Sequence, residues 1–242
     1  MLDWLGAPVD PTRVHEIGAL LSWHGRMMVL AWSIIVPVAI LAARYFKIFP
    51  GQDWPNQLDD KRWWRTHRWG QYIALVVMAL GLYLILKVPK PTPGATAAVG
   101  IHHLLGWATL FLGSLQYVAA WLRGSKGGPT DDVLRGDHYD MTRRRRIFER
   151  MHKSIGYLAL LISIAAVMTG LWQANGPRWM FAILFLWYAC VVVAFIVLQK
   201  CGMARDTYQA IWGPDAAHPG NHMQPIGVGV RKSPIQRSAS RR

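Results

Sequence analysis

Five long apolar stretches constrain the fold of this chain more than any other feature of its sequence. Each is close to or longer than the roughly 20 predominantly apolar residues that a helix needs to cross a bilayer, and almost none of their residues is charged. A soluble domain would instead show shorter amphipathic runs with a polar face. The sequence therefore predicts an all-α integral membrane protein. Its expected transmembrane helices are Ala19–Tyr45, Trp69–Leu86, His102–Leu122, Ile155–Trp172 and Trp179–Leu198.

Tryptophans mark the boundaries of these stretches. Aromatic side chains are enriched where a membrane protein meets the bilayer–water interface, because their rings combine an apolar body with a polar group. Seven of the 13 tryptophans lie at or near the ends of the stretches, namely Trp23, Trp63, Trp64, Trp69, Trp121, Trp172 and Trp179.

The basic residues are distributed unevenly between the two sides of the predicted membrane domain. A net charge of +14 would suit a nucleic-acid-binding protein, but its distribution indicates a different role. If the five helices alternate in direction, one side carries five of the 27 basic residues and the other carries 22. The positive-inside rule places the more basic side in the cytoplasm. We therefore expect a multi-pass protein of the cell inner membrane, with an extracytoplasmic N-terminus, a cytoplasmic C-terminus and no nucleic-acid partner.

Three segments follow from this topology. Residues 1–17 form an extracytoplasmic lead, residues 18–200 form the five-helix transmembrane domain, and residues 201–242 form a basic cytoplasmic tail rich in Pro and Gly, for which we expect no structure of its own. The lead has no basic n-region, so we expect the first helix to act as an uncleaved anchor. The loop Lys87–Gly100 is proline-rich and predicted to be extended. The two cysteines, Cys190 and Cys201, indicate neither a disulfide framework nor a zinc site.

Four histidines occupy matching positions near the starts of four predicted helices. His24 and His102 belong to the first and third helices, which start at the outer face, whereas His67 and His152 belong to the second and fourth, which start at the cytoplasmic face. Two imidazoles at one depth on facing helices of a bundle can bind a haem iron from both sides. The sequence therefore predicts a four-helix bundle holding two b-type haems, with irons on the order of 20 Å apart, plus a fifth helix. The lack of a Cys-x-x-Cys-His motif indicates non-covalent haem.

Glycines recur near the same histidines. Gly106 follows His102 by four residues and Gly156 follows His152 by four, which places each glycine on the same helix face as its histidine. Gly81 and Gly170 lie near the outer ends of the second and fourth helices. These glycines leave room either for a porphyrin or for close packing between helices.

Other functions remain open at this point. His103 lies about 100° round the helix from His102 and cannot serve the same haem, and the spacing to Gly106 favours His102 as the ligand. A histidine-lined metal or proton transporter is one alternative, but it predicts acidic residues within the spans, and the predicted spans contain none. A second alternative is an accessory subunit of a larger respiratory or photosynthetic membrane complex, with a mainly structural role.

Several of these residues resemble the cytochrome b561 family, in particular the branch found in bacteria and as the membrane part of proteins with a fused extracellular domain. The likeness covers roughly residues 20–198, about three quarters of the chain. It rests on Trp23-His24-Gly25-Arg26 in the first helix, Trp64, His67 and Gln71 in the second, His102, Gly106 and Gln116 in the third, and His152 with Gly156 in the fourth.

The resemblance implies a four-helix core with two b haems, one bound by His24 and His102 and one by His67 and His152, and electron transfer across the membrane. The partners expected are membrane lipid, a redox protein or quinone, and other subunits if the chain belongs to a complex. The ascorbate-using members of the family have an additional helix and basic substrate-site residues that have no counterpart in this sequence.

Haem propionates are anionic and favour basic or hydrogen-bonding partners. The candidates for the cytoplasmic haem are Arg44, Arg68 and Lys153, with Tyr45 and Arg150, and the candidate for the outer haem is Arg26. Each of these side chains is equally suited to anchor its helix at the interface.

Overall fold

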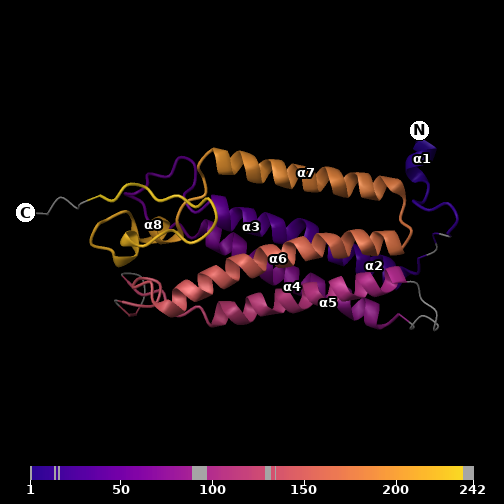
Figure 1. Cartoon of the computed structure of the whole chain (residues 1–242), viewed down its shortest axis with the longest axis horizontal. Helices are drawn as coiled ribbons and strands as arrows, with labels where there is room; N and C mark the ends of the chain where they lie inside the picture. Colours follow the sequence, from indigo (N-terminus) through magenta and orange to yellow (C-terminus); the bar gives the residue numbers. More distant parts are fainter. Residues whose placement is uncertain are drawn as a thin grey trace, which may run out of the picture. The chain divides into compact units, whose positions relative to one another are not determined.

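The computed structural model describes residues 2–13, 15, 17–88, 97–128, 132–133 and 135–236. Its described part is helical, and five helices are long and apolar enough to cross a membrane. The predicted all-α membrane architecture is therefore confirmed. These helices are α2–η1–α3 (Ala19–Met28, Val29–Ile35 and Val36–Tyr45), α4 (Arg62–Leu86), α5 (Ala97–Trp121), α6 (Arg143–Gln173) and α7 (Arg178–Lys200) (Figure 1). The predicted extended conformation of the loop Lys87–Gly100 concerns mainly residues 89–96, which lie outside the described part.

Two helices begin well before their apolar stretches. Helix α4 begins at Arg62 rather than Trp69, and α6 begins at Arg143 rather than Ile155. Arg, Glu and Lys are good helix formers, so the hydrogen-bond ladder continues beyond the point where the side chains stop being apolar. The 31 residues of α6 span about 47 Å, compared with a hydrocarbon core of about 30 Å. The four arginines at positions 143–146 are therefore the first turn of a helix, where a loop was predicted.

The first membrane helix contains a π-helical segment just before a proline. The segment is η1, Val29–Ile35, and Pro37 follows it in the first turn of α3. Proline has no N–H to donate to the carbonyl four residues earlier, which belongs to Ser33. The indole Nε1 of Trp187 donates to this carbonyl at 2.5 Å, and the hydroxyls of Ser33 and Tyr188 lie 2.7 Å apart. Helix α7 thus supplies hydrogen bonds at the proline of the first helix.

The chain divides into two compact units, and each long helix contributes to both. The first unit contains Met1–Ala39, Arg68–Leu112 and Leu158–Phe195, and the second contains Ile40–His67, Gly113–Tyr157 and Ile196–Arg242. His24 and His102 belong to the first unit, and His67 and His152 belong to the second.

The N-terminal lead is held in the first unit by the turn between α6 and α7. It begins with the short helix α1 (Leu2–Gly6). Asn175 is 2% exposed with a φ of +48°, and its side-chain oxygen accepts from the backbone N–H of Asp10 at 2.9 Å. Its Nδ2 donates to the carbonyls of Asp10 and Arg13 at 3.0 and 2.7 Å. One buried side chain thus pairs the backbone polar groups of the lead.

Residues 201–236 of the C-terminal tail are folded within the second unit, so the expectation that the tail would have no structure of its own was wrong for this part. It contains α8 (Thr207–Trp212) and the 3-10 turn η2 (Pro219–His222). Met141, Tyr208, Trp212 and Ile226 form a buried cluster that joins the tail to the end of the loop between α5 and α6. A few buried aromatic and aliphatic side chains offset the ordering cost that the Pro- and Gly-rich composition suggested would be prohibitive.

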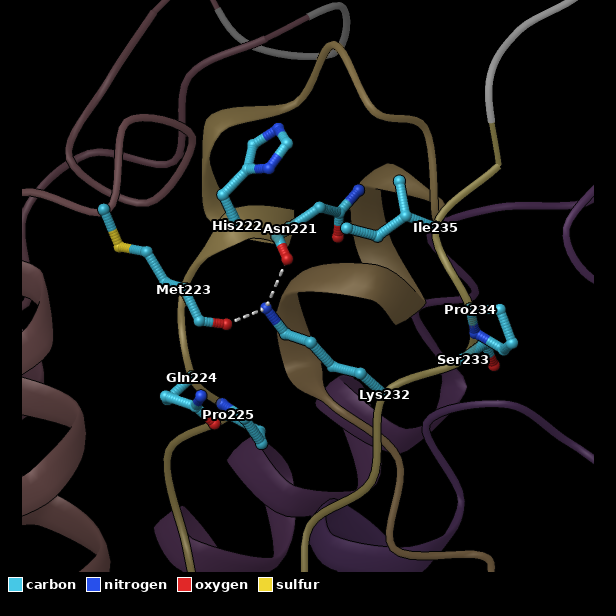
Figure 2. A pocket seen from close by; sticks show the side chains of 9 residues that line it. All are labelled: Asn221, His222, Met223, Gln224, Pro225, Lys232, Ser233, Pro234 and Ile235. Carbon is cyan, nitrogen blue, oxygen red and sulfur yellow. Dashed lines mark hydrogen bonds between the residues drawn. The ribbon is translucent and has the colours of Figure 1, made fainter.

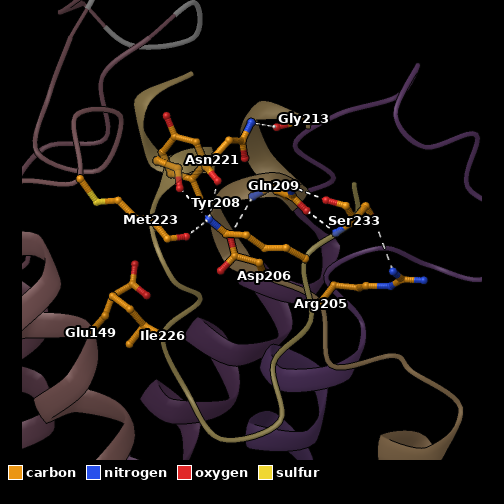
Figure 3. Close-up of polar contacts among 12 residues, drawn as sticks. Glu149, Arg205, Asp206, Tyr208, Gln209, Gly213, Asn221, Met223, Ile226 and Ser233 are labelled. Atoms are coloured by element: carbon orange, nitrogen blue, oxygen red, sulfur yellow. Dashed lines mark hydrogen bonds and ion pairs between the residues drawn. The ribbon is translucent and has the colours of Figure 1, made fainter. Parts of the chain in front are cut away.

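Side-chain hydrogen bonds join the segment around α8 and η2 to residues 232 and 233 near the end of the described tail (Figure 3). The amide of Gln209 pairs with the backbone of Ser233, donating to its carbonyl at 3.1 Å and accepting from its N–H at 2.7 Å. The Lys232 ammonium donates to the carbonyls of Gly220, Asn221 and Met223, and it lies beside an open hollow of about 560 Å³ (Figure 2). Burial lowers the pKa of Lys232, while the nearby carboxylate of Asp206 opposes that shift.

Candidate functional site

His24 and His102 lie together in the first unit, on α2 and α5. Their ring centroids are 6.4 Å apart and their planes are 80° apart. His24 Nδ1 is 2.9 Å from the Gly81 carbonyl oxygen on α4, and His102 Nδ1 is 3.0 Å from the Ala166 carbonyl oxygen on α6. Because a carbonyl only accepts hydrogen bonds, both contacts place the imidazole proton on Nδ1. Each Nε2 then keeps its lone pair, which is the state that ligates a metal.

His67 and His152 lie together in the second unit, on α4 and α6. Their ring centroids are 6.2 Å apart and their planes are 83° apart. Aromatic side chains flank both rings: Phe148 stacks on His152 with centroids 5.2 Å apart, and Trp64 lies beside His67 at 6.3 Å. Phe148 precedes His152 by four residues, which is the spacing that brings two side chains together on one helix face.

The residue facing Nδ1 of His152 is a glutamine, not a backbone carbonyl. The Gln116 amide on α5 lies 2.7 Å from His152 Nδ1 and 3.0 Å from the His152 carbonyl oxygen. In the orientation that satisfies all its neighbours, the amide nitrogen donates to both atoms and Oε1 accepts from the Gly156 N–H at 3.3 Å. This contact distinguishes His152 from both histidines of the first unit.

Both pairs have the spacing of two imidazoles on one metal ion. With a metal–nitrogen bond of about 2 Å on each side and about 1 Å from nitrogen to ring centre, two imidazoles on opposite sides of one ion have centroids about 6 Å apart. The observed values are 6.4 and 6.2 Å. Among the described residues there is no group of three or more His, Cys, Asp or Glu side chains suited to a metal ion. Two protein ligands alone suit an ion that receives its other ligands from a macrocycle.

The glycines near the histidines have different surroundings. A Cβ on Gly170 would lie 2.7 Å from Cε1 of His102, so this glycine makes room for the imidazole. A Cβ on Gly81 would lie 3.0 Å from that of Met27, while the Gly81 carbonyl pairs with His24. A Cβ on Gly106 would meet nothing within 4 Å, which leaves open space on the face of α5 that carries His102. The backbone at Gly106 therefore fits a flat cofactor against it.

The predicted propionate partners have protein contacts of their own. In the second unit, Lys153 donates to Glu149 at 3.0 Å and to the Ile226 carbonyl at 2.7 Å, and Arg44 donates to Tyr157, Gln199 and the Val228 carbonyl. In the first unit, Arg68 is exposed and lies over the ring of Trp69, and Arg26 lies over that of Trp23. Their assignment to haem propionates stays a prediction.

A buried charged cluster lies among the cations of the second unit. The Glu149 carboxylate is 3.0 Å from both Arg145 Nε and Lys153 Nζ. Lys47, only 5% exposed, donates to the Arg205 carbonyl at 2.9 Å. Burial lowers the pKa of Lys47 to about 7, and the positive charge of Lys153 acts in the same direction. The tail thus supplies backbone acceptors to basic groups near the ends of α3 and α6.

Sequence analysis did not assign Gln116 or Phe148 to the site. Phe148 lies at a helical spacing from His152 that would have marked it as a neighbour. Gln116 has no such local relation, because its contact depends on how α5 packs against α6. Two signals were available: Gln116 is among the residues that resemble the cytochrome b561 family, and its polar side chain lies within an apolar span, where polar groups are costly and usually have a partner.

Comparisons with known proteins show which family this chain is similar to. Residues 23–125 match the family model described as eukaryotic cytochrome b561. The chain is 30% identical over 199 residues to a cytochrome b561, DM13 and DOMON domain-containing protein of Arabidopsis thaliana, covering 78% of this chain and 20% of that protein. It is 25% identical over 196 residues to an Arabidopsis cytochrome b561 and DOMON domain-containing protein, covering 77% and 42%.

An animal relative is also similar. The chain is 30% identical over 153 residues to ferric-chelate reductase 1 of Bos taurus, covering 63% of this chain and 22% of that protein. The chain thus spans about a fifth to two fifths of the length of these relatives. No solved structure matches the chain.

Proposed function

This chain belongs to the cytochrome b561 family, and from that premise we propose that it is a dihaem cytochrome with two bis-histidine sites. The family and the membrane helices make it a haem-b electron-transfer protein of the membrane. The number of haems and their ligands are our proposal. We assign His24 and His102 to one haem and His67 and His152 to the other, with Arg44, Arg68 and Lys153 as candidate partners of the propionates.

The observation that carries the proposal is the matching geometry of the two histidine pairs. Each pair joins two different helices, with ring centroids 6.4 and 6.2 Å apart. The carbonyls of Gly81 and Ala166 hold His24 and His102 in the tautomer that presents Nε2 as a ligand. A bound haem would supply one-electron redox chemistry. Histidines on both sides of the ring leave no open coordination position, so the chain would transfer electrons without binding a substrate at iron.

The transporter alternative has less support. Glu149 lies in α6, beyond the predicted apolar span, so α6 does carry an acidic residue. However, Glu149 is paired with Arg145 and Lys153. A metal or proton pathway needs successive polar stations across the membrane. Two imidazole pairs, each with the ring spacing of two ligands on one ion, suit haem ligation better.

An ordered tail would favour the accessory-subunit alternative if another chain were needed to hold it. The described tail is instead held by this chain, through Tyr208 and Trp212 packed with Met141. Its order therefore requires no other subunit.

We propose that a redox protein or a quinone beside the membrane donates the electrons, and that a redox protein, a quinone or a soluble oxidant accepts them. The name of the bovine relative indicates that it reduces ferric chelates. A ferric chelate is therefore one class of acceptor to test on the reduced protein.

Histidine variants test the haem assignment. The protein is purified in detergent and its haem b is counted per chain by pyridine haemochrome absorbance. We expect two haems in the wild type and one each in His24→Ala, His102→Ala, His67→Ala and His152→Ala. Each double variant across the pairs should have none, because one ligand from each site is gone.

His103→Ala is the matched control. His103 adjoins His102 and is exposed, so its replacement should leave two haems. The proposal is contradicted if wild-type protein lacks the reduced α-band of a b haem, or if His24→Ala and His67→Ala each retain both haems.

A further inference from the structure

The contact between Gln116 and His152 points to a role that the backbone contacts of His24 and His102 do not require. We propose that Gln116 is a positioning residue whose side-chain amide selects the tautomer of His152 and sets the basicity of that ligand. The inference deepens the proposed function and rests on it, because it concerns the haem assigned to His67 and His152.

The orientation of the Gln116 amide is linked to which nitrogen of the His152 imidazole carries the proton. When the Gln116 nitrogen donates to Nδ1 of His152 at 2.7 Å, Nδ1 carries a lone pair and the proton is on Nε2. A protonated Nε2 cannot ligate iron. The orientation of Gln116 that satisfies all its neighbours therefore stabilises the tautomer of His152 that is unable to bind haem through Nε2.

The Gln116 amide can also take the opposite orientation. Because the oxygen and nitrogen of an amide are nearly the same size, a half-turn brings Oε1 to the same position, 2.7 Å from Nδ1. Nδ1–H then donates to Oε1, and Nε2 presents its lone pair. This turn also brings Oε1 within 3.0 Å of the His152 carbonyl oxygen and replaces the acceptor at Gly156 N–H. Binding of a metal to Nε2 and rotation of the amide are thus linked.

His24 and His102 have a different kind of partner at Nδ1. The Gly81 and Ala166 carbonyls belong to helix backbones and cannot exchange a donor for an acceptor, so they favour the tautomer of His24 and His102 that leaves Nε2 free to ligate. An acceptor at Nδ1 makes the imidazole a more basic ligand, and such second-shell hydrogen bonds tune affinity and reduction potential. At His152 this tuning depends on a side chain, so a single substitution can change it.

Two substitutions should act in opposite directions. Gln116→Glu is close in shape and offers only acceptor oxygens, so it should favour the ligating tautomer, raise ligand basicity and stabilise the oxidised iron. Gln116→Leu removes the acceptor and should favour the reduced iron. The affected haem is the one that is lost in His152→Ala. We expect its reduction potential to fall in Gln116→Glu and to rise in Gln116→Leu. Each shift should be about 59 mV, which is about tenfold in the one-electron reduction equilibrium.

The measurement is a potentiometric titration of purified dihaem protein, followed by visible and paramagnetic resonance spectra. The other haem is the internal control, and its potential should not change. Gln224→Glu, an exposed substitution in the same unit, controls for the added negative charge and should move neither haem. If Gln116→Leu retains only one haem, the comparison of Gln116→Glu with wild type still decides the direction.

The outcomes separate the two proposals. Two haems with unchanged potentials in Gln116→Glu would overturn the role of Gln116 while leaving the ligand assignment intact. So would an equal shift of both haems, or a shift in the same direction in both variants. Wild-type protein without haem would overturn the proposed function, and the role of Gln116 with it.

Discussion

At the level of single residues, the groups that contact the imidazoles determine which ring nitrogen can ligate a metal, and the histidines alone do not. The carbonyls of Gly81 and Ala166 and the amide of Gln116 face Nδ1 of His24, His102 and His152, so they govern which ring nitrogen carries the proton. The positions of these histidines near helix starts could be predicted, because a local pattern marks them. The partners could not, because Gly81, Ala166 and Gln116 each belong to a helix other than the one that carries the histidine they contact.

His138 is a second histidine whose surroundings have a measurable consequence. It is 2% exposed and packs against Tyr208 and Trp212 with ring centroids 5.7 and 6.1 Å away. Burial lowers the pKa of His138 to about 3, and the positive charge of Arg145 acts in the same direction while Glu149 opposes it. No local sequence pattern marks this burial, because Tyr208 and Trp212 come from the tail.

Stability should therefore fall in acid because of His138. In the unfolded chain a histidine binds its proton below a pKa of about 6.5, whereas folded His138 stays neutral until about pH 3. The unfolded state then binds more protons, and the free energy of unfolding decreases as the pH falls from about 6.5 toward 3. His138→Phe keeps an aromatic side chain but removes this proton, so its unfolding temperature should drop less between pH 7.5 and pH 5.

Thermal unfolding of detergent-purified protein, followed by tryptophan fluorescence, provides the measurement. His222→Phe, at an exposed position in the same unit, is the control and should keep the wild-type pH dependence. Equal losses of unfolding temperature in wild type and His138→Phe would contradict the assignment.

Among the secondary-structure elements, each long helix corresponds to one of the predicted apolar stretches, but α4 and α6 begin several residues before theirs. Length and apolarity predicted the five spans, because a bilayer imposes both. The early starts of α4 and α6 could not be predicted from apolarity, since charged residues outside the membrane continue a helix as readily as they form a loop. The π-helical segment η1 has a cause that is visible in the sequence, Pro37, but its hydrogen-bond donor, Trp187, lies on another helix.

Removing that donor should weaken the attachment of α7. In Trp187→Phe the Ser33 carbonyl loses the indole N–H that lies at 2.5 Å. An unsatisfied buried acceptor costs about 1–3 kcal/mol in water-soluble proteins, and polar contacts within membranes average about 0.6 kcal/mol. We expect a loss of free energy of unfolding within this range.

A double-mutant cycle tests whether the stability loss in Trp187→Phe comes from the lost hydrogen bond. Pro37→Ala restores a backbone N–H four residues after Ser33, so Trp187→Phe should cost less in the Pro37→Ala background than in wild type. Steric trapping or detergent-induced unfolding measures the four free energies. Additive effects would show that the indole contributes through packing and not through this hydrogen bond.

For the whole molecule, the sequence predicts an orientation that follows from charge. The second unit contains most of the basic residues, including the four arginines at positions 143–146 and the basic residues of the tail. We propose that the C-terminus is cytoplasmic, because the positive-inside rule applies to loops of this length.

Cysteine labelling tests this orientation. Cys201 follows α7 and is exposed, and Cys190 lies within α7. In a Cys190→Ser background, a membrane-impermeant maleimide should label Cys201 in inside-out vesicles and not in intact spheroplasts. A variant that combines Cys190→Ser with Cys201→Ser gives the background labelling. Labelling of Cys201 from outside intact cells would reverse the topology.

The sequence by itself determined the membrane class, the five spans and the four histidines at matching helix positions. These features depend on local composition and spacing, because a bilayer requires apolar helices of a certain length. Only the tertiary structure decided which groups face His24, His102 and His152 and how the described tail folds. Those depend on contacts between residues far apart in the chain, such as Gln116 with His152 and Tyr208 with Met141, and no local pattern encodes them.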